Sequence, residues 1–365
     1  METTKNILKD AAMTKETSKR HHTALDRLFR YADFLNFGEV HVKFDHETGL
    51  RAIVAIHNLK NGPAIGGCRL IKYDTTDDAL EDALRLGYMM SYKASASNLA
   101  HGGAKAVIMM PKVIKDRVRF FEVFGDFVNS LGGKYITAVD SGTSPSDMDI
   151  VERRTPYVTC TTKCGDPSPQ TALGVRRGME AAVKFKLGKE SLKDIHVTIQ
   201  GAGHVGYYLA KELHACGARL TMCDMNQISL DRCVKEFGAE TCAVDAIYDV
   251  KADIFAPCAL GAVLNLETIN RLNVPIVAGS ANNQLAHHNY SALLQERGIL
   301  YAPDFVINAG GLIYVAGFYD LGDVRPAVKQ VENIYQAMMD IFEKAKQKNC
   351  TPLEIAEGMA LARLR

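Results

Sequence analysis

The sequence predicts an α/β protein made of two domains. Short apolar runs, the pattern of buried strands, alternate along the chain with longer stretches in which apolar residues recur at helical spacing. The chain has 365 residues, which is long enough for two hydrophobic cores. Two prolines in Asp166-Pro167-Ser168-Pro169 indicate a linker or hinge between the halves.

The composition excludes several classes of partner. The net charge is +1, which gives no electrostatic basis for binding nucleic acid or an anionic membrane. No apolar run reaches the length of a membrane-spanning helix, and the polar extension over residues 1–25 lacks the apolar core of a signal peptide. The nine cysteines are scattered without a zinc-binding spacing. We therefore expect a cytoplasmic protein with reduced thiols and no metal site.

The first half begins with strand and helix signals in alternation. Residues 40–56 form two alternating apolar runs around the turn Glu47-Thr48-Gly49, which predicts a hairpin. The glycines of residues 62–69 indicate a place where the backbone approaches another group closely. A helix is expected from about Asp77 to Lys93, a buried strand over 106–109, a helix over 116–131 and a strand over 135–139.

Two lysines and one aspartate in this half are candidates for catalysis. Lys93 closes the expected helix, and Lys105 follows Gly102-Gly103 directly before the buried strand over 106–109. A lysine fixed beside a buried strand can lose hydration, which lowers its pKa. Asp140 ends a strand and enters a loop of small residues, where a carboxylate can transfer protons. From the residues alone, two solvated lysines and a turn or helix-cap aspartate stay open as alternatives.

The second half contains a nucleotide-binding pattern. A strand over 195–200 leads into Gly201-Ala202-Gly203-His204-Val205-Gly206, a helix follows, and a strand over 219–223 ends at Asp224. The glycines permit a tight turn against a pyrophosphate, and the acid suits a ribose 2′-hydroxyl. This predicts a Rossmann-type domain. Because Asp224 would repel a 2′-phosphate, the pattern favours NAD over NADP.

The remainder continues the parallel βα alternation. Strands are expected over 254–256, 276–278 and 300–302, and the loops that follow the first two lie where open α/β sheets bind ligands. A helix opens near Asn308, and the last fifty residues read as helical. Within them, Thr351-Pro352-Leu353-Glu354 has the cap, first-turn proline and capping-box glutamate of a helix start.

Eight motifs in order resemble the amino-acid dehydrogenases of the Glu/Leu/Phe/Val family, most closely its leucine-specific members. They are GPAIGG, SYK…GGAK, AVDSGT, PSPQTALGV, GAGHVG, APCALGAVLN, GSANNQL and APDFVINAGG, and the similarity spans about residues 37 to 362. The resemblance implies a substrate-binding and oligomerisation domain of residues 1–165 plus the C-terminal helices from about 330 to 365. It also implies a Rossmann-type NAD-binding domain over 166–329, an active-site cleft between the two, and a homo-oligomer, either an octamer or a dimer.

The same resemblance implies a reaction and its residues. An L-amino acid and NAD would give a 2-oxo acid, ammonium and NADH by reversible oxidative deamination. Lys93 would bind the substrate carboxylate, Lys105 would activate the attacking water, and Asp140 would shuttle protons. The other implied substrate residues are Gly66, Gly67 and Asn283, and the other implied cofactor residues are Thr171, Tyr207, Cys258, Ala259, Leu260, Asn282 and Asn308.

The resemblance also bears on the side chain of the substrate. Ile65 stands where related glutamate dehydrogenases have a lysine for the side-chain carboxylate, and Ala138, Leu312 and Val315 match the rest of the pocket. An unpaired carboxylate is costly among apolar groups, so leucine, valine or isoleucine fits better than glutamate.

The sequence departs from the family pattern at a few positions. Ala104 and His204 replace a glycine and an asparagine, and Val139 and Tyr314 differ from the usual residues close to the pocket. The differences at Val139 and Tyr314 leave open the alternative that the enzyme carries out the same oxidative deamination on phenylalanine or tryptophan. A second alternative is a non-catalytic regulator that binds NAD or an amino acid, although Lys93, Lys105 and Asp140 are all present.

Overall fold

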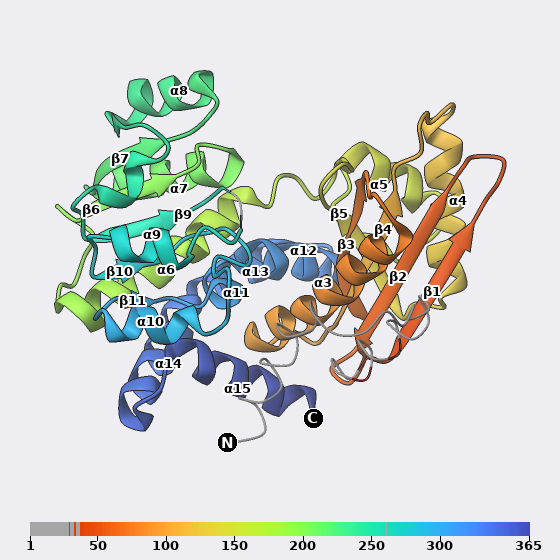
Figure 1. The fold of residues 1–365 in the computed structure, drawn as a ribbon. Coiled ribbons are helices and arrows are strands. Elements are labelled where there is room, and N and C mark those ends of the chain that lie inside the picture. Colours follow the sequence, from red (N-terminus) through yellow and green to blue (C-terminus); the bar gives the residue numbers. More distant parts are fainter. Residues whose placement is uncertain (1–28, 30–32, 34–36, 260) are drawn as a thin grey trace, which may run out of the picture.

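The chain folds into two α/β lobes, each built around its own sheet (Figure 1). The computed structural model describes residues 29, 33, 37–259 and 261–365. The N-terminal extension over residues 1–25 and the predicted cofactor residue Leu260 lie outside the described residues.

The first lobe contains a five-stranded mixed sheet in the order β1-β2-β4-β3-β5. Its strands are β1 (Glu39–Phe44), β2 (Arg51–Asn58), β3 (Ala64–Ile71), β4 (Gly102–Met109) and β5 (Tyr135–Val139). The hairpin prediction is confirmed, because β1 and β2 pair antiparallel. The glycine-rich segment is a strand, β3, which pairs in parallel with β4 on one side and β5 on the other. The sequence had indicated only a close backbone approach there.

Helices cover both faces of this sheet. Helix α3 (Thr76–Ala96) covers one face through Ala79, Ala83 and Leu84. Helices α4 (Arg117–Ser130) and α5 (Pro145–Glu152) cover the other, where a row of phenylalanines meets the strands. The Thr75 hydroxyl and the Asp78 carboxylate form a capping box that starts α3. The helix continues to Ala96, so Lys93 lies in its last turn rather than at its end.

The second lobe contains a six-stranded parallel sheet in the order β11-β10-β9-β6-β7-β8. The strands are β6 (His196–Gln200), β7 (Arg219–Cys223), β8 (Glu240–Thr241), β9 (Ile254–Pro257), β10 (Ile276–Val277) and β11 (Leu300–Tyr301). The chain extends the sheet in one direction from β6 through β7 and in the other through β9. This reversal creates a switch point at the carboxyl end of β6, where such sheets bind ligands.

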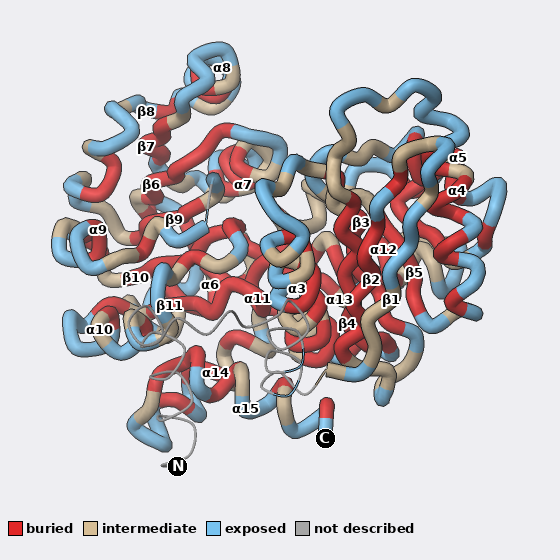
Figure 2. Tube along the Cα trace, turned by 45° about the vertical axis from the view of Figure 1, so that its right-hand side comes forward, coloured by how far each residue is buried: buried red, intermediate tan, exposed pale blue. Residues whose placement is uncertain are grey.

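Helices alternate with these strands and bury them, as Figure 2 shows. They are α6 (Ser168–Leu187), α7 (His204–Ala215), α8 (Gln227–Phe237), the 3₁₀ turn η1 (Ala246–Asp249), α9 (Leu266–Arg271) and α10 (Tyr290–Glu296). Helix α6 begins at Ser168, inside the proline-containing segment that the sequence indicated as a linker or hinge, because Pro169 fits the first helical turn. The predicted strand–glycine loop–helix–strand order over 196–223 is confirmed.

The C-terminal helices connect the lobes. They are α11 (Asp304–Ile307), α12 (Gly310–Leu321), α13 (Arg325–Glu332), α14 (Ile334–Lys348) and α15 (Pro352–Leu364). Helices α12, α13 and α14 pack on α6, whereas α15 returns to pack on α3 of the first lobe (Figure 1). The predicted capping box of Thr351 and Glu354 starts α15. The domain limits at residue 165 and near residue 330 stay a prediction.

None of the helices that the structure describes combines the length and the apolar character needed to cross a bilayer. Within the same residues, no three histidine, cysteine, aspartate or glutamate side chains gather closely enough to hold a metal ion.

Candidate active site

The two lobes face each other at a site built around Lys105 and Asp140. Lys105 lies inside β4, and not before a strand as the sequence suggested. Asp140 follows β5, and β3 separates β4 from β5 in the sheet. Despite the intervening strand, the Lys105 ammonium donates a hydrogen bond to Oδ2 of Asp140. Both side chains are largely buried, at 7% and 16% exposure.

Gly67 on β3 makes this contact possible. Ile65 pairs with Gly103 on β4, and Gly67 pairs with Ala138 on β5, so Gly67 stands between Lys105 and the strand that carries Asp140. A β-carbon at residue 67 would lie 2.8 Å from the Val139 oxygen and 2.9 Å from Cβ of Asp140. The adjacent Gly66 has no room either, because its β-carbon would overlap the carbonyl oxygen of Ala104. Gly67 therefore leaves the space that the ion pair fills, and Gly66 allows the backbones of β3 and β4 to approach each other.

The loop after β5 holds the Asp140 carboxylate in place. The Asp140 amide donates to Thr143 Oγ1 at 2.9 Å, and the Thr143 hydroxyl lies 2.9 Å from the Cys68 carbonyl. The Ser141 amide donates to Asp140 Oδ1. Burial alone would raise the pKa of the Asp140 carboxyl, but the charges of Lys105 and Arg69 outweigh it and hold that pKa well below its usual range.

Lys93 extends from the first lobe to the second. Its Nζ donates to Asn282 Oδ1 at 3.0 Å, in the loop after β10. Asn308 Nδ2 donates to the same oxygen at 2.9 Å. Loss of hydration lowers the pKa of Lys93 to about 8, although the buried Asp304 carboxylate opposes that shift. Lys93, Asn282 and Asn308, which the sequence predicted separately, thus form one cluster.

An apolar surface adjoins the lysines. Ile65 and Ala138 lie on the same face of the sheet as Lys105, because residues two apart on a strand share a face. Leu312 and Val315 of α12 are buried in the same hydrophobic cluster as these two residues. The Thr159 hydroxyl donates to the Val315 carbonyl at 3.0 Å and ties α12 to the first lobe.

The glycine loop after β6 has the geometry of a dinucleotide-binding turn. Gly201 has φ of 108°, in the region that favours glycine, and its β-carbon would meet Ala259 at 3.0 Å. A β-carbon on Gly206 would overlap the Gly201 carbonyl oxygen. Gly203 has open space around its α-carbon and immediately precedes His204 and Val205 in the first turn of α7. The residues present therefore fit a pyrophosphate at the helix N-terminus.

Asp224 holds this loop to the end of β7. Its Oδ2 accepts the Ala202 amide at 2.6 Å, and its Oδ1 accepts the Asn226 amide at 2.7 Å. A carboxylate has about four acceptor positions, so two remain for a ligand. Asp224 therefore has a structural role in addition to the predicted contact with a ribose.

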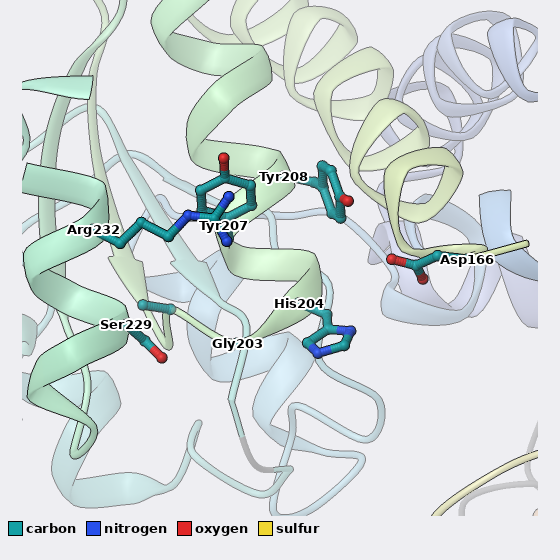
Figure 3. Close-up of a pocket in the computed structure, with 8 residues that line it drawn as sticks. Asp166, Gly203, His204, Tyr207, Tyr208, Ser229 and Arg232 are labelled. Carbon is teal, nitrogen blue, oxygen red and sulfur yellow. The ribbon is translucent and has the colours of Figure 1, made fainter. Parts of the chain in front are cut away.

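A cavity of about 300 Å³ lies against the outer side of the glycine loop (Figure 3). His204, Tyr207 and Tyr208 of α7 line it on one side, and Ser229 and Arg232 of α8 on another. The Tyr207 hydroxyl donates to Glu236 at 2.6 Å, and the Arg232 guanidinium lies 3.7 Å from the centre of its ring. The predicted cofactor residue Tyr207 thus also joins α7 to α8.

The remaining predicted residues lie around the same region. The Thr171 hydroxyl lies beside Gly311 at the start of α12. The Cys258 amide donates to the Gln200 carbonyl at 2.8 Å, which fixes the loop after β9 against β6. Asn283 has a left-handed φ of 51°, and its carbonyl accepts the Ala262 amide.

Comparisons with known proteins agree with this geometry. The family model described as "Glu/Leu/Phe/Val dehydrogenase, dimerisation domain" matches residues 36–157, and the one described as "Glutamate/Leucine/Phenylalanine/Valine dehydrogenase" matches residues 224–356. Leucine dehydrogenase of Thermoactinomyces intermedius is 46% identical over 93% of each chain. Leucine dehydrogenase of Geobacillus stearothermophilus is 44% identical over 92% of this chain and 93% of the relative. The chain belongs to the Glu/Leu/Phe/Val dehydrogenase family.

A solved structure supports the same assignment for the fold. L-tryptophan dehydrogenase from Nostoc punctiforme matches with a TM-score of 0.81 and 38% identity, covering 92% of this chain and 98% of that one. This dehydrogenase is therefore an oxidoreductase that acts on amino acids, with an α/β N-terminal lobe that matches the dimerisation domain of the family and a Rossmann-type lobe.

Sequence reasoning missed two charged residues of the site in this dehydrogenase. Arg69 Nε lies 3.7 Å from Asp140 Oδ1, and its Nη1 donates to Asp82 at 2.9 Å. Arg69 is two residues beyond Gly67, so the alternation of strand faces would have placed it beside Lys105 had β3 been predicted as a strand. For Asp82, on the first half of α3, the sequence carried no such signal.

Proposed function

We propose that this enzyme catalyses the NAD-dependent, reversible oxidative deamination of branched-chain L-amino acids, leucine first and also valine and isoleucine. The products would be the 2-oxo acid, ammonium and NADH. The observation that carries the proposal is the buried Lys105–Asp140 pair, with Lys93 nearby and an apolar surface beside it. The intact trio and the family membership argue against a non-catalytic regulator.

Each side chain of the trio has a distinct chemical task in this proposal. The Lys93 ammonium binds the α-carboxylate and fixes the α-carbon. Lys105, in its neutral form, takes a proton from the water that attacks the iminium carbon. Asp140 Oδ2, which contacts Lys105, accepts a proton and returns it to the departing amine. The proton thus moves between groups that are already in contact.

The glycine loop, Asp224 and the neighbouring loops would hold NAD. The Gly203–His204 turn would take the pyrophosphate, and the free acceptor positions of Asp224 the adenosine ribose. We assign Thr171, Cys258, Ala259, Asn282 and Asn308 to the same cofactor. Bound NAD would supply the hydride acceptor. The substrate would lie between it and Lys105, shielded from water by the two lobes.

The pocket supports leucine over glutamate and aromatic substrates. Ile65, Ala138, Leu312 and Val315 offer no charge for a second carboxylate, which would cost several kcal/mol there. The Tyr314 hydroxyl donates to the Cys164 carbonyl at 2.7 Å, which holds the ring next to Val315 in the sequence, and we expect this ring to leave less depth for an aromatic side chain. The relatives reported above include two leucine dehydrogenases at 46% and 44% identity.

We also propose that the enzyme is a cytoplasmic homo-oligomer, either a dimer or an octamer. The first lobe matches a dimerisation domain. Its sheet ends in β1, an edge strand on which Val42 and Phe44 are 51% and 61% exposed. An exposed apolar edge strand is a surface that a second copy can cover. All nine cysteines are free thiols, as a reducing compartment would keep them.

A substrate panel tests the proposed function. NADH absorbance would be followed with purified enzyme and each L-amino acid. We expect leucine, isoleucine or valine to give the highest kcat/KM, phenylalanine and tryptophan less, and glutamate at least about a hundredfold less than leucine. Glutamate oxidation as fast as leucine oxidation would refute the pocket. An aromatic optimum would overturn the side-chain assignment and leave the reaction standing.

A further inference from the structure

Arg69 forms a second ionic contact to the catalytic aspartate, on the side away from Lys105. Its Nε lies 3.7 Å from Asp140 Oδ1. That nitrogen is buried and has no hydrogen-bond partner among the described residues, which is costly for a cationic donor. The Asp140 carboxylate lies within ion-pair distance of this nitrogen, so the positive charge of Arg69 acts on that carboxylate.

Asp82 of α3 fixes the other end of the guanidinium. Its Oδ2 accepts Arg69 Nη1 at 2.9 Å and the Tyr73 hydroxyl at 2.6 Å, while its Oδ1 accepts Arg85 Nη2 at 3.2 Å. The Asp82 side chain is only 12% exposed, so these bonds form in a region of reduced screening. Burial would raise the pKa of Asp82, but the Tyr73 hydrogen bond and the Arg69 charge lower it overall.

The two oxygens of Asp140 consequently have different surroundings. Oδ1 faces the Ser141 amide and Arg69, two groups that do not release protons during turnover. Oδ2 faces the Lys105 ammonium, which does release a proton in the proposed reaction. Charges thus alternate in sign along Asp82, Arg69, Asp140 and Lys105.

We propose that Arg69 is a positioning residue for amino-acid oxidation: it anchors Oδ1 of Asp140, so that Oδ2 is the oxygen that exchanges protons, and it offsets the aspartate charge beside Lys105. This rests on the proposed function, which assigns Asp140 the proton transfers. Arg69 touches neither substrate nor cofactor in this role. It acts through Asp140, and Asp82 keeps it in position.

The groups around Asp140 define the expected direction of each charge change. Those that act on its carboxylate come from β4, β3, β5 and α3 and are Lys105, Arg69, Cys68, Tyr135 and Lys93. Because Lys105 and Asp140 are in contact, the pH limb of kcat/KM belongs to the pair and not to one residue. Removing a nearby cation raises the pKa values of such a pair, and removing an anion lowers them.

Three variants test this with the best amino acid of the substrate panel. In Arg69→Gln the acidic limb of the kcat/KM profile should move up by at least about one pH unit, because a cation is lost. In Asp82→Asn the limb should move down or stay, because an anion is lost while Arg69 remains. Arg85→Gln is the matched control, since Arg85 contacts the same Asp82 but is 50% exposed and does not face Asp140. Its profile should superimpose on that of the wild type.

An upward shift in Arg69→Gln without an upward shift in Asp82→Asn supports the proposal, because a merely structural role would impair both variants alike. A superimposable profile in Arg69→Gln, or an upward shift in Asp82→Asn, would overturn it. If circular dichroism shows that Arg69→Gln does not fold, the profiles of Asp82→Asn and Arg69→Lys test the proposal instead. Because lysine keeps the positive charge, Arg69→Lys should retain the acidic limb of the wild-type kcat/KM profile. A wild-type enzyme that oxidises no amino acid would instead refute the proposed function.

Discussion

Gly67 is the residue on which the contact between Lys105 and Asp140 depends, because the ammonium crosses β3 at that point. A methyl group there would press on Val139 and on the Asp140 carboxylate, whose Oδ2 would lie 3.1 Å away. We predict that Gly67→Ala lowers kcat by about a hundredfold, the scale of losing a positioned proton-transfer group.

The control for that change is Gly358→Ala. Gly358 lies in α15, with open space around its α-carbon, and alanine favours a helix by about 1 kcal/mol over glycine. Its kcat should equal that of the wild type, and its melting temperature should not fall. Steady-state kinetics of both variants decide the matter, and equal kcat in Gly67→Ala and the wild type would contradict the assigned geometry.

The lowered pKa of Lys93 predicts a pH dependence of carboxylate binding. The ammonium is charged below about 8 and loses its proton above that value. The inhibition constant of 4-methylpentanoate, a carboxylate without an amino group, should therefore rise by about tenfold per pH unit above the pKa. Lys93→Arg, which stays charged, should show weaker but pH-independent inhibition. A flat wild-type profile between pH 7 and 10 would count against Lys93 as the carboxylate ligand.

At the scale of elements, sequence patterns located most strands and helices but not β3, an interior strand of the first sheet. The hairpin, α4, β5 and the glycine-loop unit follow from local periodicity and turn residues. Strand β3 has Gly66 and Gly67 at its centre, and glycine lowers the propensity of a segment to form a strand on its own. Its two parallel neighbours impose the strand, and that pairing is not visible in a local window.

The same lack of information about strand pairing explains which site residues could be found from the sequence. Lys105, Asp140 and Gly67 carried motif signals, whereas Arg69 required knowledge of which faces of β3 and β4 coincide. The contact of Lys93 with Asn282 joins two lobes and residues 189 positions apart, so no local pattern could predict it.

The loop between β6 and α7 supports a prediction about cofactor choice. Asp224 should make kcat/KM for NAD at least about a hundredfold higher than for NADP through repulsion of the 2′-phosphate. Because Asp224 also accepts the Ala202 and Asn226 amides, Asp224→Asn is a better test than alanine: it keeps one acceptor oxygen and the shape. The NAD/NADP ratio of kcat/KM should fall at least tenfold in this variant. An unchanged ratio would assign Asp224 a structural role alone.

At the scale of the whole molecule, the edge of the first sheet predicts self-association. Replacing Val42 and Phe44 of β1 together with lysine should reduce the oligomer mass measured by light scattering, because charge on an edge strand opposes pairing with a second copy. Val113→Lys is the control, since Val113 is 69% exposed but is not part of the edge strand: it lies in the loop between β4 and α4. An oligomer mass that does not change in the double variant would exclude this edge as the contact.

In the proposed reaction the two lobes form one site: the first lobe supplies the lysines and the aspartate, and the second supplies the nucleotide loop. Removal of Lys105 alone should therefore stop chemistry without loss of cofactor binding. The most direct test is the rate of NADH formation from leucine in Lys105→Ala, compared with its NADH affinity by fluorescence. We predict a kcat at least about a hundredfold below wild type with an unchanged NADH dissociation constant. A Lys105→Ala enzyme that keeps the wild-type kcat would contradict the account.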